Sequence, residues 1–197
     1  MTSPINLSGR VAIVTGAGGG LGRAHALLLA SRGAQVIVND LGDAADAVVA
    51  EIRAAGGQAR AAKCSVADAE AVQAMVVAVL AEFGRIDILI NNAGILRDKS
   101  FAKMDLADFR LVLDVHVMGA AHCTHAVWNT MRAQNYGRIV MTTSCSGLYG
   151  NFGQANYAAA KMALVGMMQT LGIEGEKHDI RVNCLAPTGA TRMMEGI

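Results

Sequence analysis

The chain has 197 residues, and its 17 lysines and arginines nearly balance its 16 aspartates and glutamates, which gives a formal net charge of +1. This neutrality argues against nucleic acid as a partner. Hydrophobic residues make up 53% of the chain and charged residues 17%, against usual shares of about 45–50% and about 25%, so the composition excludes a disordered chain.

Short apolar segments alternate with helical segments along the chain. Strands are predicted at residues 10–15, 35–39, 58–64, 87–90, 138–143 and 180–185. Helices are predicted at residues 20–32, 44–55, 68–83, 106–134 and 155–175, and loops at residues 91–103 and 144–153. Repeated βα units with short apolar strands predict an α/β fold, a doubly wound parallel sheet of the Rossmann type in three layers. We expect a single domain over residues 1–197.

A glycine cluster, TGAGGGLG, joins the first predicted strand to the first predicted helix. Glycines allow a tight turn and a close approach of the backbone to a pyrophosphate, and the following helix N-terminus favours an anion. The spacing is G-x-x-x-G-x-G, and a phosphate-binding P-loop is excluded because no Gly-Lys-Ser/Thr follows. The residues predicted to bind the cofactor here are Gly16, Gly18, Gly19, Gly20, Leu21 and Gly22.

Asp40 follows the second predicted strand, 18 positions after Gly22. An acidic residue about 20 positions beyond such glycines binds the adenosine ribose hydroxyls and repels the 2′-phosphate of NADP. We expect no lysine or arginine near Asp40 to compensate, so NAD is the predicted cofactor. Taken alone, Asp40 is better explained as a solvated turn residue, but its position behind the glycine loop reverses that interpretation.

Tyr157 and Lys161 stand four positions apart on a predicted helix, so their side chains share one face. A free tyrosine is a poor base at neutral pH, and an adjacent ammonium together with a nicotinamide cation lowers its pKa. Ser144 ends the fifth predicted strand, where it can donate to a substrate oxygen. The simpler interpretation of Tyr157 and Lys161 is an ordinary surface pair.

These motifs, together with Asn91-Asn92-Ala93-Gly94 after the fourth predicted strand, resemble the short-chain dehydrogenase/reductase family in order and spacing. The resemblance implies an NAD(P)-dependent oxidoreductase. It makes Tyr157 the general acid/base, with Lys161 lowering its pKa and Ser144 polarising the carbonyl. Further cofactor contacts that it implies are Ser65, Val66, Asn92, Ala93, Gly94, Pro187 and Thr188.

A narrower likeness is carried by the segments NDLG, NNAGILRDKS and GLYGNFGQANYAAAK. They resemble the 3-hydroxyacyl-CoA dehydrogenase unit of peroxisomal multifunctional enzymes, which implies a 3-hydroxyacyl-CoA or related substrate. The chain departs from the wider family at His116, where many members carry a catalytic asparagine. It also ends at Ile197, where a substrate-covering segment and a seventh strand usually follow, so we expect these to be missing.

Two classes of function remain open. The first is an NAD-dependent enzyme acting on a secondary alcohol or ketone, and the second is a non-catalytic NAD-binding or regulatory protein on the same fold. The expected partners are a small-molecule substrate and further copies of the chain, as a tetramer or dimer. No apolar run approaches the roughly 18 residues of a membrane span, no metal site is expected, and a cytoplasmic location is predicted.

Overall fold

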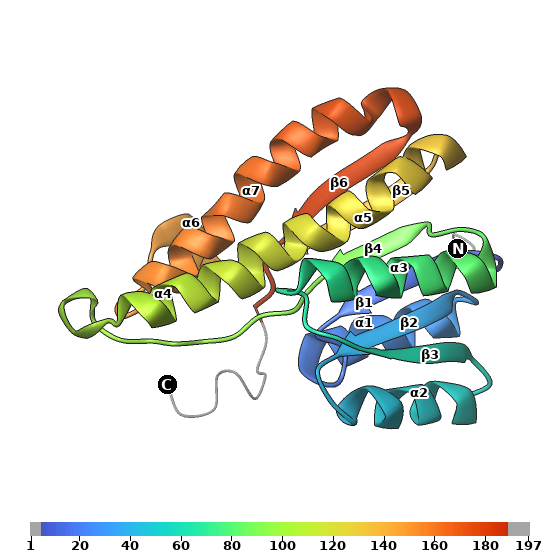
Figure 1. The fold of residues 1–197 in the computed structure, drawn as a ribbon, viewed down its shortest axis with the longest axis horizontal. Helices are drawn as coiled ribbons and strands as arrows, with labels where there is room; N and C mark the ends of the chain where they lie inside the picture. Colours follow the sequence, from blue (N-terminus) through green and yellow to red (C-terminus); the bar gives the residue numbers. More distant parts are fainter. Residues whose placement is uncertain (1–4, 189–197) are drawn as a thin grey trace.

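A computed structural model describes residues 5–188 of the chain (Figure 1). Its strands are β1 (Val11–Thr15), β2 (Gln35–Asp40), β3 (Gln58–Lys63), β4 (Ile88–Asn91), β5 (Gly137–Thr142) and β6 (Ile180–Leu185). Its α-helices are α1 (Gly20–Ser31), α2 (Ala44–Ala54), α3 (Ala69–Phe83), α4 (Leu106–Leu113), α5 (Gly119–Gln134), α6 (Cys145–Tyr149) and α7 (Ala155–Gly175). Three single turns complete the elements, at Phe101–Lys103, Asp114–Met118 and Glu176–His178.

The six strands form one sheet in the order β3-β2-β1-β4-β5-β6, and every neighbouring pair is parallel. From β1 the chain adds β2 and β3 on one side, then crosses to the other side of β1 and adds β4, β5 and β6 there. The strand order therefore reverses between the neighbouring strands β1 and β4, as in a doubly wound Rossmann-type sheet. The predicted fold class is therefore confirmed. Because all strands are parallel, their carboxyl ends lie at one edge of the sheet, where such folds bind ligands.

Helices cover the sheet on both faces, which makes three layers (Figure 1). On one face, α1 and α2 bury Ala26, Ala30, Val48 and Ile52 against alternate residues of β1 and β2. On the other face, α3, α5 and α7 bury a second set of apolar side chains against the alternating positions of the same strands. Successive side chains of a strand point to opposite faces, so each short apolar strand contributes to both cores.

Helix ends follow local signals in the sequence. Asp68 accepts a hydrogen bond from the backbone N–H of Ala71 at the start of α3, and Gly84 ends that helix with a φ of 69°. A side-chain acceptor before the first turn and a left-handed glycine after the last are the usual helix caps. These signals explain why most predicted boundaries lie within a residue or two of the observed ones.

Two predicted segments need correction. The single helix expected over residues 106–134 is divided into α4 and α5 by a π-helical turn at Asp114–Met118, and Gly119 begins the second part. The expected loop at 144–153 contains the short helix α6. Both differences lie beside Tyr157: His116 of the π-helical turn packs on its ring, and α6 begins next to Ser144.

No helix in residues 5–188 is both long enough and apolar enough to cross a membrane. The predictions that concern the end of the chain at Ile197 fall outside the described residues.

Candidate active site

A cleft of about 500 Å³ opens at the carboxyl edge of the sheet, within the size range of small-molecule sites. Fourteen of the predicted residues line it: Gly16, Gly19, Gly20, Leu21, Asp40, Ser65, Val66, Asn92, Ala93, Gly94, Ser144, Tyr157, Lys161 and Pro187. Three other predicted residues do not line it: Gly18, Gly22 and Thr188. The structure thus brings together, around one cleft, residues that lie between Gly16 and Pro187 in the sequence.

The glycines of the loop after β1 have two different roles. A Cβ on Gly22 would lie 2.2 Å from the carbonyl oxygen of Gly16, and a Cβ on Gly16 would lie 2.7 Å from the Cα of Ala93. These two glycines are therefore needed so that the loop can fold on itself and against β4. Gly20 has a φ of +52° and open space around its Cβ position, and it faces the cleft.

The start of α1 lies at this loop without a side-chain cap. Gly19 precedes the helix with extended backbone and makes no side-chain hydrogen bond. The first N–H groups of a helix have no partners within it and carry a partial positive charge. Because Gly19, Gly20 and Leu21 line the cleft, these N–H groups suit an anion such as a pyrophosphate.

Asp40 is the last residue of β2, and its carboxylate is held by the backbone on both oxygens. Gly18 N–H donates to Oδ2 at 2.8 Å and Leu41 N–H donates to Oδ1 at 2.8 Å. A Cβ on Gly18 would lie only 2.8 Å from that Oδ2, so glycine is required for this approach. The carboxylate is thereby fixed beside the glycine loop with lone pairs left for ribose hydroxyls.

The expectation that no lysine or arginine lies near Asp40 is wrong. Lys63 of β3 is the strand partner of Asp40. Sequence reasoning missed it because 23 positions separate the two residues, and only the register of the sheet brings them together.

The segment after β4 is tied to β1 by Thr15. Its hydroxyl accepts hydrogen bonds from the N–H groups of Asn92 and Ala93 at 3.0 and 3.1 Å. The side-chain amide of Asn92 donates in return to the carbonyl oxygens of Thr15 and Gly16. The hydrogen bonds between Asn92 and the Thr15–Gly16 segment therefore fix the glycine loop. They require a hydroxyl at the end of β1 and a side-chain amide after β4, because these two strand ends are neighbours.

Ser144, Tyr157 and Lys161 meet at the other half of the cleft. Ser144 caps α6, where its hydroxyl accepts from the N–H of Ser146 at 3.2 Å. Burial raises the pKa of Tyr157, a hydrogen bond with Ser144 lowers it, and the charge of Asp98 raises it further. The net pKa is above the usual value, so the lowering expected from Lys161 is not met in the protein alone.

Lys161 is buried, with 3% of its surface exposed, and donates a 2.6 Å hydrogen bond to the carbonyl oxygen of Thr142. Its ammonium lies 5.4 Å from the centre of the Tyr157 ring. Burial lowers the pKa of Lys161 to about 8, partly offset by Cys184. A buried ammonium with a single protein acceptor has donors left for a ligand in the cleft.

His116, from the π-helical turn, packs edge-on to Tyr157 with ring centres 5.3 Å apart. Its Nε2 lies 2.9 Å from both the N and the O of Ile95. Burial, followed by the charge of Lys161, lowers its pKa to about 3, so the imidazole is neutral. Its role at this position is therefore not that of a general acid at neutral pH.

Sequence reasoning left out several residues that line the cleft: Asn39, Leu41, Cys64, Ile95, Leu96, Val115, His116, Thr142, Thr143, Ser146, Asn151 and Gln154. Most of them adjoin predicted site residues at strand ends, which is the signal that could have found them. Within the described residues no three His, Cys, Asp or Glu side chains gather as metal ligands.

The cleft fits a nicotinamide dinucleotide. One half presents an uncapped helix start and a fixed carboxylate, which match a pyrophosphate and a ribose diol. The other half presents an ammonium, a phenol and a hydroxyl, with the hydroxyl of Thr142 buried beside them without a protein partner. These polar groups suit a sugar and a reacting carbonyl.

Comparison with known proteins agrees with this geometry. A sequence model described as short chain dehydrogenase matches residues 10–196. The chain is 53% identical to peroxisomal multifunctional enzyme type 2 of Mus musculus, over 100% of this chain and 28% of that protein. It is 51% identical to the putative short-chain type dehydrogenase/reductase Rv0148 of Mycobacterium tuberculosis, over 95% of this chain and 69% of that protein.

Solved structures are similar as well. A short chain dehydrogenase from Mycobacterium avium superposes with a TM-score of 0.91 at 40% identity, covering 97% of this chain and 71% of that one. A 7 alpha-hydroxysteroid dehydrogenase complexed with NADH and 7-oxo glycochenodeoxycholic acid superposes with a TM-score of 0.89 at 35% identity, covering 93% of this chain and 72% of that chain. The chain spans less than half the length of the multifunctional relatives that it matches.

Proposed function

Because the chain belongs to the short-chain dehydrogenase family, we propose that it is an NAD-dependent oxidoreductase acting on a secondary alcohol or ketone. The observation that carries this proposal is the position of Ser144, Tyr157 and Lys161 on the same cleft as the glycine loop and Asp40. Groups for proton transfer and groups for dinucleotide binding then face a common space, as hydride transfer requires.

The proposed chemistry assigns a separate task to each side chain. In the oxidative direction, Tyr157 takes the proton of the substrate hydroxyl while the nicotinamide ring accepts the hydride. Ser144 donates to the same substrate oxygen and orients it. Lys161 binds the nicotinamide ribose and stabilises the phenolate. In the reductive direction, Tyr157 returns the proton to the carbonyl oxygen.

NAD is the proposed cofactor because the carboxylate of Asp40 is fixed beside the glycine loop, where it would bind the adenosine ribose hydroxyls. A 2′-phosphate there would meet a negative charge. The Asp40→Ala variant should narrow the preference for NAD over NADP, measured as the ratio of kcat/KM values for the two cofactors. An unchanged ratio would refute the ribose role of Asp40.

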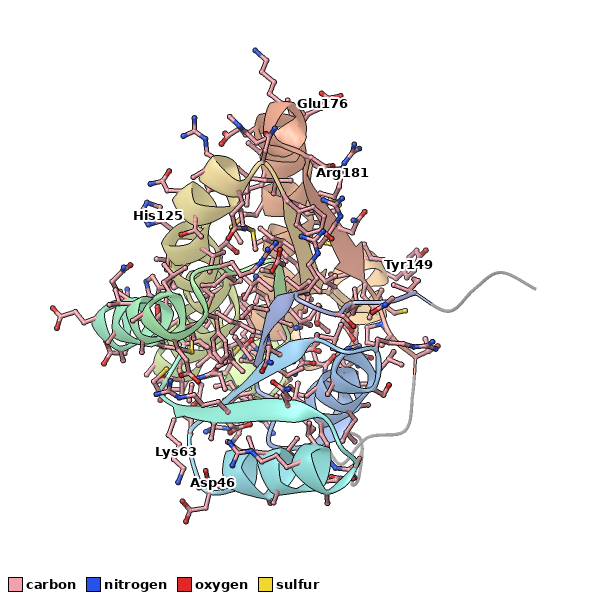
Figure 2. The ribbon with its side chains drawn as sticks, turned by 90° about the vertical axis from the view of Figure 1, so that its right-hand side faces the viewer. Asp46, Lys63, His125, Tyr149, Glu176 and Arg181 are labelled. Carbon is pink, nitrogen blue, oxygen red and sulfur yellow. The ribbon has the colours of Figure 1, made fainter. Side chains whose placement is uncertain are left out.

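The proposed substrate is a 3-hydroxyacyl-CoA or a related thioester. Relatives named as peroxisomal multifunctional enzyme and 3-oxoacyl-[acyl-carrier-protein] reductase support this class. The segment between Ser144 and Tyr157 also exposes Leu148, Tyr149 and Phe152, and Figure 2 shows Tyr149 projecting from the surface. Exposed apolar groups next to a site suit an acyl chain.

The test is NADH formation by the purified chain with NAD and a graded series of 3-hydroxyacyl-CoA esters, with simple secondary alcohols alongside. Tyr157→Phe should lower kcat by about 10²-fold or more and leave the dissociation constant for NADH nearly unchanged. Tyr136→Phe is the matched control, because Tyr136 packs against Arg10 and Arg138 and does not line the cleft. Unchanged turnover in Tyr157→Phe would remove it from the mechanism. NADH binding without turnover of any substrate would favour a non-catalytic, NAD-binding protein.

We also propose that the chain forms a homo-oligomer. Large apolar side chains are exposed on the long helices, among them Leu106, Met162 and Ile173, and apolar surface of this kind is typically covered by a partner. Light scattering of the purified chain tests this, and a monomer at micromolar concentration would refute it.

A cytoplasmic location remains a prediction, and the peroxisomal relatives favour another compartment. Imaging of the tagged native protein distinguishes the two.

A further inference from the structure

Lys63 lies next to the residue proposed to bind the adenosine ribose. It pairs with Asp40 in the register of β2 and β3, and paired strands are about 4.8 Å apart. Side chains alternate between faces, and Val38 and Ala61, two positions before Asp40 and Lys63, both pack against the α1–α2 face. Asp40 and Lys63 therefore project from the same face, toward the start of α2.

The ammonium of Lys63 is held by two carboxylates at the start of α2. Its Nζ lies 2.7 Å from Oδ1 of Asp43 and 2.5 Å from Oδ2 of Asp46. Figure 2 shows Lys63 and Asp46 reaching toward one another from β3 and α2. These contacts raise the pKa of Lys63, and its ammonium is paired with Asp43 and Asp46 rather than with Asp40.

The start of α2 also adjoins the glycine loop. A Cβ on Gly18 would lie 2.8 Å both from the Cβ of Ala44 and from Oδ2 of Asp40. Three carboxylates and one ammonium therefore lie near the start of α2, next to the glycine loop and the proposed place of the 2′-hydroxyl, with a local charge of about −2. Only Asp40 among them lines the cleft itself. A phosphate monoester at that place adds about −1.5 to −2 more.

We propose that Asp43 and Asp46 are specificity-determining residues that exclude NADP by holding Lys63 away from the 2′-phosphate. The inference rests on the proposed function, and it goes beyond the role of Asp40. A lysine on a flexible four-carbon stem is a natural phosphate ligand. Freed from the two carboxylates, Lys63 can turn toward Asp40 and offset part of its repulsion. The Asp43–Lys63–Asp46 group therefore adds a second barrier against NADP.

The test compares the binding of NADH and NADPH to the purified chain by fluorescence titration at low salt. The double variant Asp43→Asn/Asp46→Asn should raise the affinity for NADPH relative to NADH about tenfold. The same measurement at high salt should show a smaller gain, because exposed charges are screened. Thermal unfolding of each variant verifies that it is folded.

Two further variants separate this role from a purely structural one. Adding Lys63→Met to the double variant should remove most of the gain, because the phosphate then has no ammonium to bind, and should leave only the part due to the lost repulsion by the two carboxylates. Glu82→Gln removes the partner of Arg60, another ion pair of β3, and should leave the NADPH-to-NADH ratio unchanged. A gain of the same size without Lys63 would overturn the proposal, and so would an unchanged ratio in the double variant.

The outcomes also distinguish the inference from the function on which it rests. If the wild-type chain binds neither nucleotide, the proposed function is wrong and the inference fails with it. If NADH binds tightly and the ratio does not respond to Asp43→Asn/Asp46→Asn, only the role of these two aspartates is refuted.

Discussion

Lys161 lies beside Tyr157 and makes no direct hydrogen bond to it in the described structure: the ammonium lies 5.4 Å from the centre of the Tyr157 ring and donates to the carbonyl oxygen of Thr142. Burial lowers the pKa of Lys161 to about 8 and raises the pKa of Tyr157. Burial disfavours the charged form of each group, so the two pKa values move apart from ordinary values that lie close together near 10. A bound nicotinamide cation would then supply the positive charge that favours the Tyr157 phenolate.

In the protein alone, Tyr157 should ionise above its ordinary pKa of about 10. Adding NAD should lower this pKa, because the nicotinamide cation favours the phenolate. Ultraviolet difference titration of tyrosinate measures this shift, and subtraction of the Tyr157→Phe titration removes the other two tyrosines. Ionisation of Tyr157 below its ordinary pKa in the nucleotide-free chain would contradict the prediction.

Lys161→Met should stabilise the fold while impairing function. The pKa of Lys161 is about 8 in the folded chain and about 10.4 in an unfolded chain. The unfolded chain binds the proton more tightly, so the cost of burying the ammonium is complete below pH 8 and fades as the pH rises toward 10. Urea unfolding at neutral pH should show a gain on the order of 1–3 kcal/mol.

The exposed Lys177 supplies the control for this experiment, and Lys177→Met should leave the free energy of unfolding nearly unchanged. The gain in Lys161→Met should shrink near pH 10. A gain independent of pH would show that packing, and not the buried charge, is its cause.

Asp87→Asn should destabilise the fold from the opposite edge of the sheet. Asp87 is fully buried and accepts hydrogen bonds from Arg10, Arg85 and the N–H of Val11. Burial raises its pKa, but these donors outweigh burial, and the net pKa is lowered. Removal of a buried carboxylate that neutralises arginines costs about 3 kcal/mol, measurable by urea unfolding at neutral pH.

The pH dependence of Asp87 follows from its lowered pKa. Its contribution is complete above the ordinary value near 3.9 and is lost as the pH falls through the lower folded value. The difference in the free energy of unfolding between the wild-type chain and Asp87→Asn should therefore disappear in strong acid. Asp179→Asn removes a more exposed partner of Arg138 and Arg181 and should lower the free energy of unfolding less than Asp87→Asn does at neutral pH.

Gly94→Ala should destabilise the chain, because a Cβ there would lie 2.3 Å from Cε1 and 3.0 Å from Nδ1 of His116. His116 is buried against Tyr157, so the clash displaces the ring or the loop, at a cost of about 1–3 kcal/mol. Gly166→Ala is the matched control on α7, because its Cβ meets nothing within 4 Å. Thermal unfolding should show Gly166→Ala unchanged or stabilised, by about 0.5–1 kcal/mol. Equal effects of the two variants would contradict this prediction.

Much of the fold could be predicted from the sequence because the relevant signals are local. Short apolar runs predicted most strands within about two residues, since a strand covered on both faces needs apolar side chains at nearly every position. The exception to the apolar pattern is β3, whose sequence QARAAK is half polar and gives only a weak strand signal. Caps such as Asp68 and Gly84 predicted helix ends because they act on backbone groups a few residues away. The four-residue spacing of Tyr157 and Lys161 also sufficed to place them on one helix face.

Other features were decided only by the tertiary structure, because they depend on register and packing between distant segments. The π-helical turn that places His116 on Tyr157 has no local sequence pattern comparable to a cap. The pKa shifts of Tyr157 and Lys161 arise from burial, which spacing does not reveal. The neighbourhood of Asp40 and Lys63 comes from the pairing of β2 with β3. The sequence by itself therefore determined the elements and the chemical groups, and the assembled sheet decided which charges face the cofactor cleft.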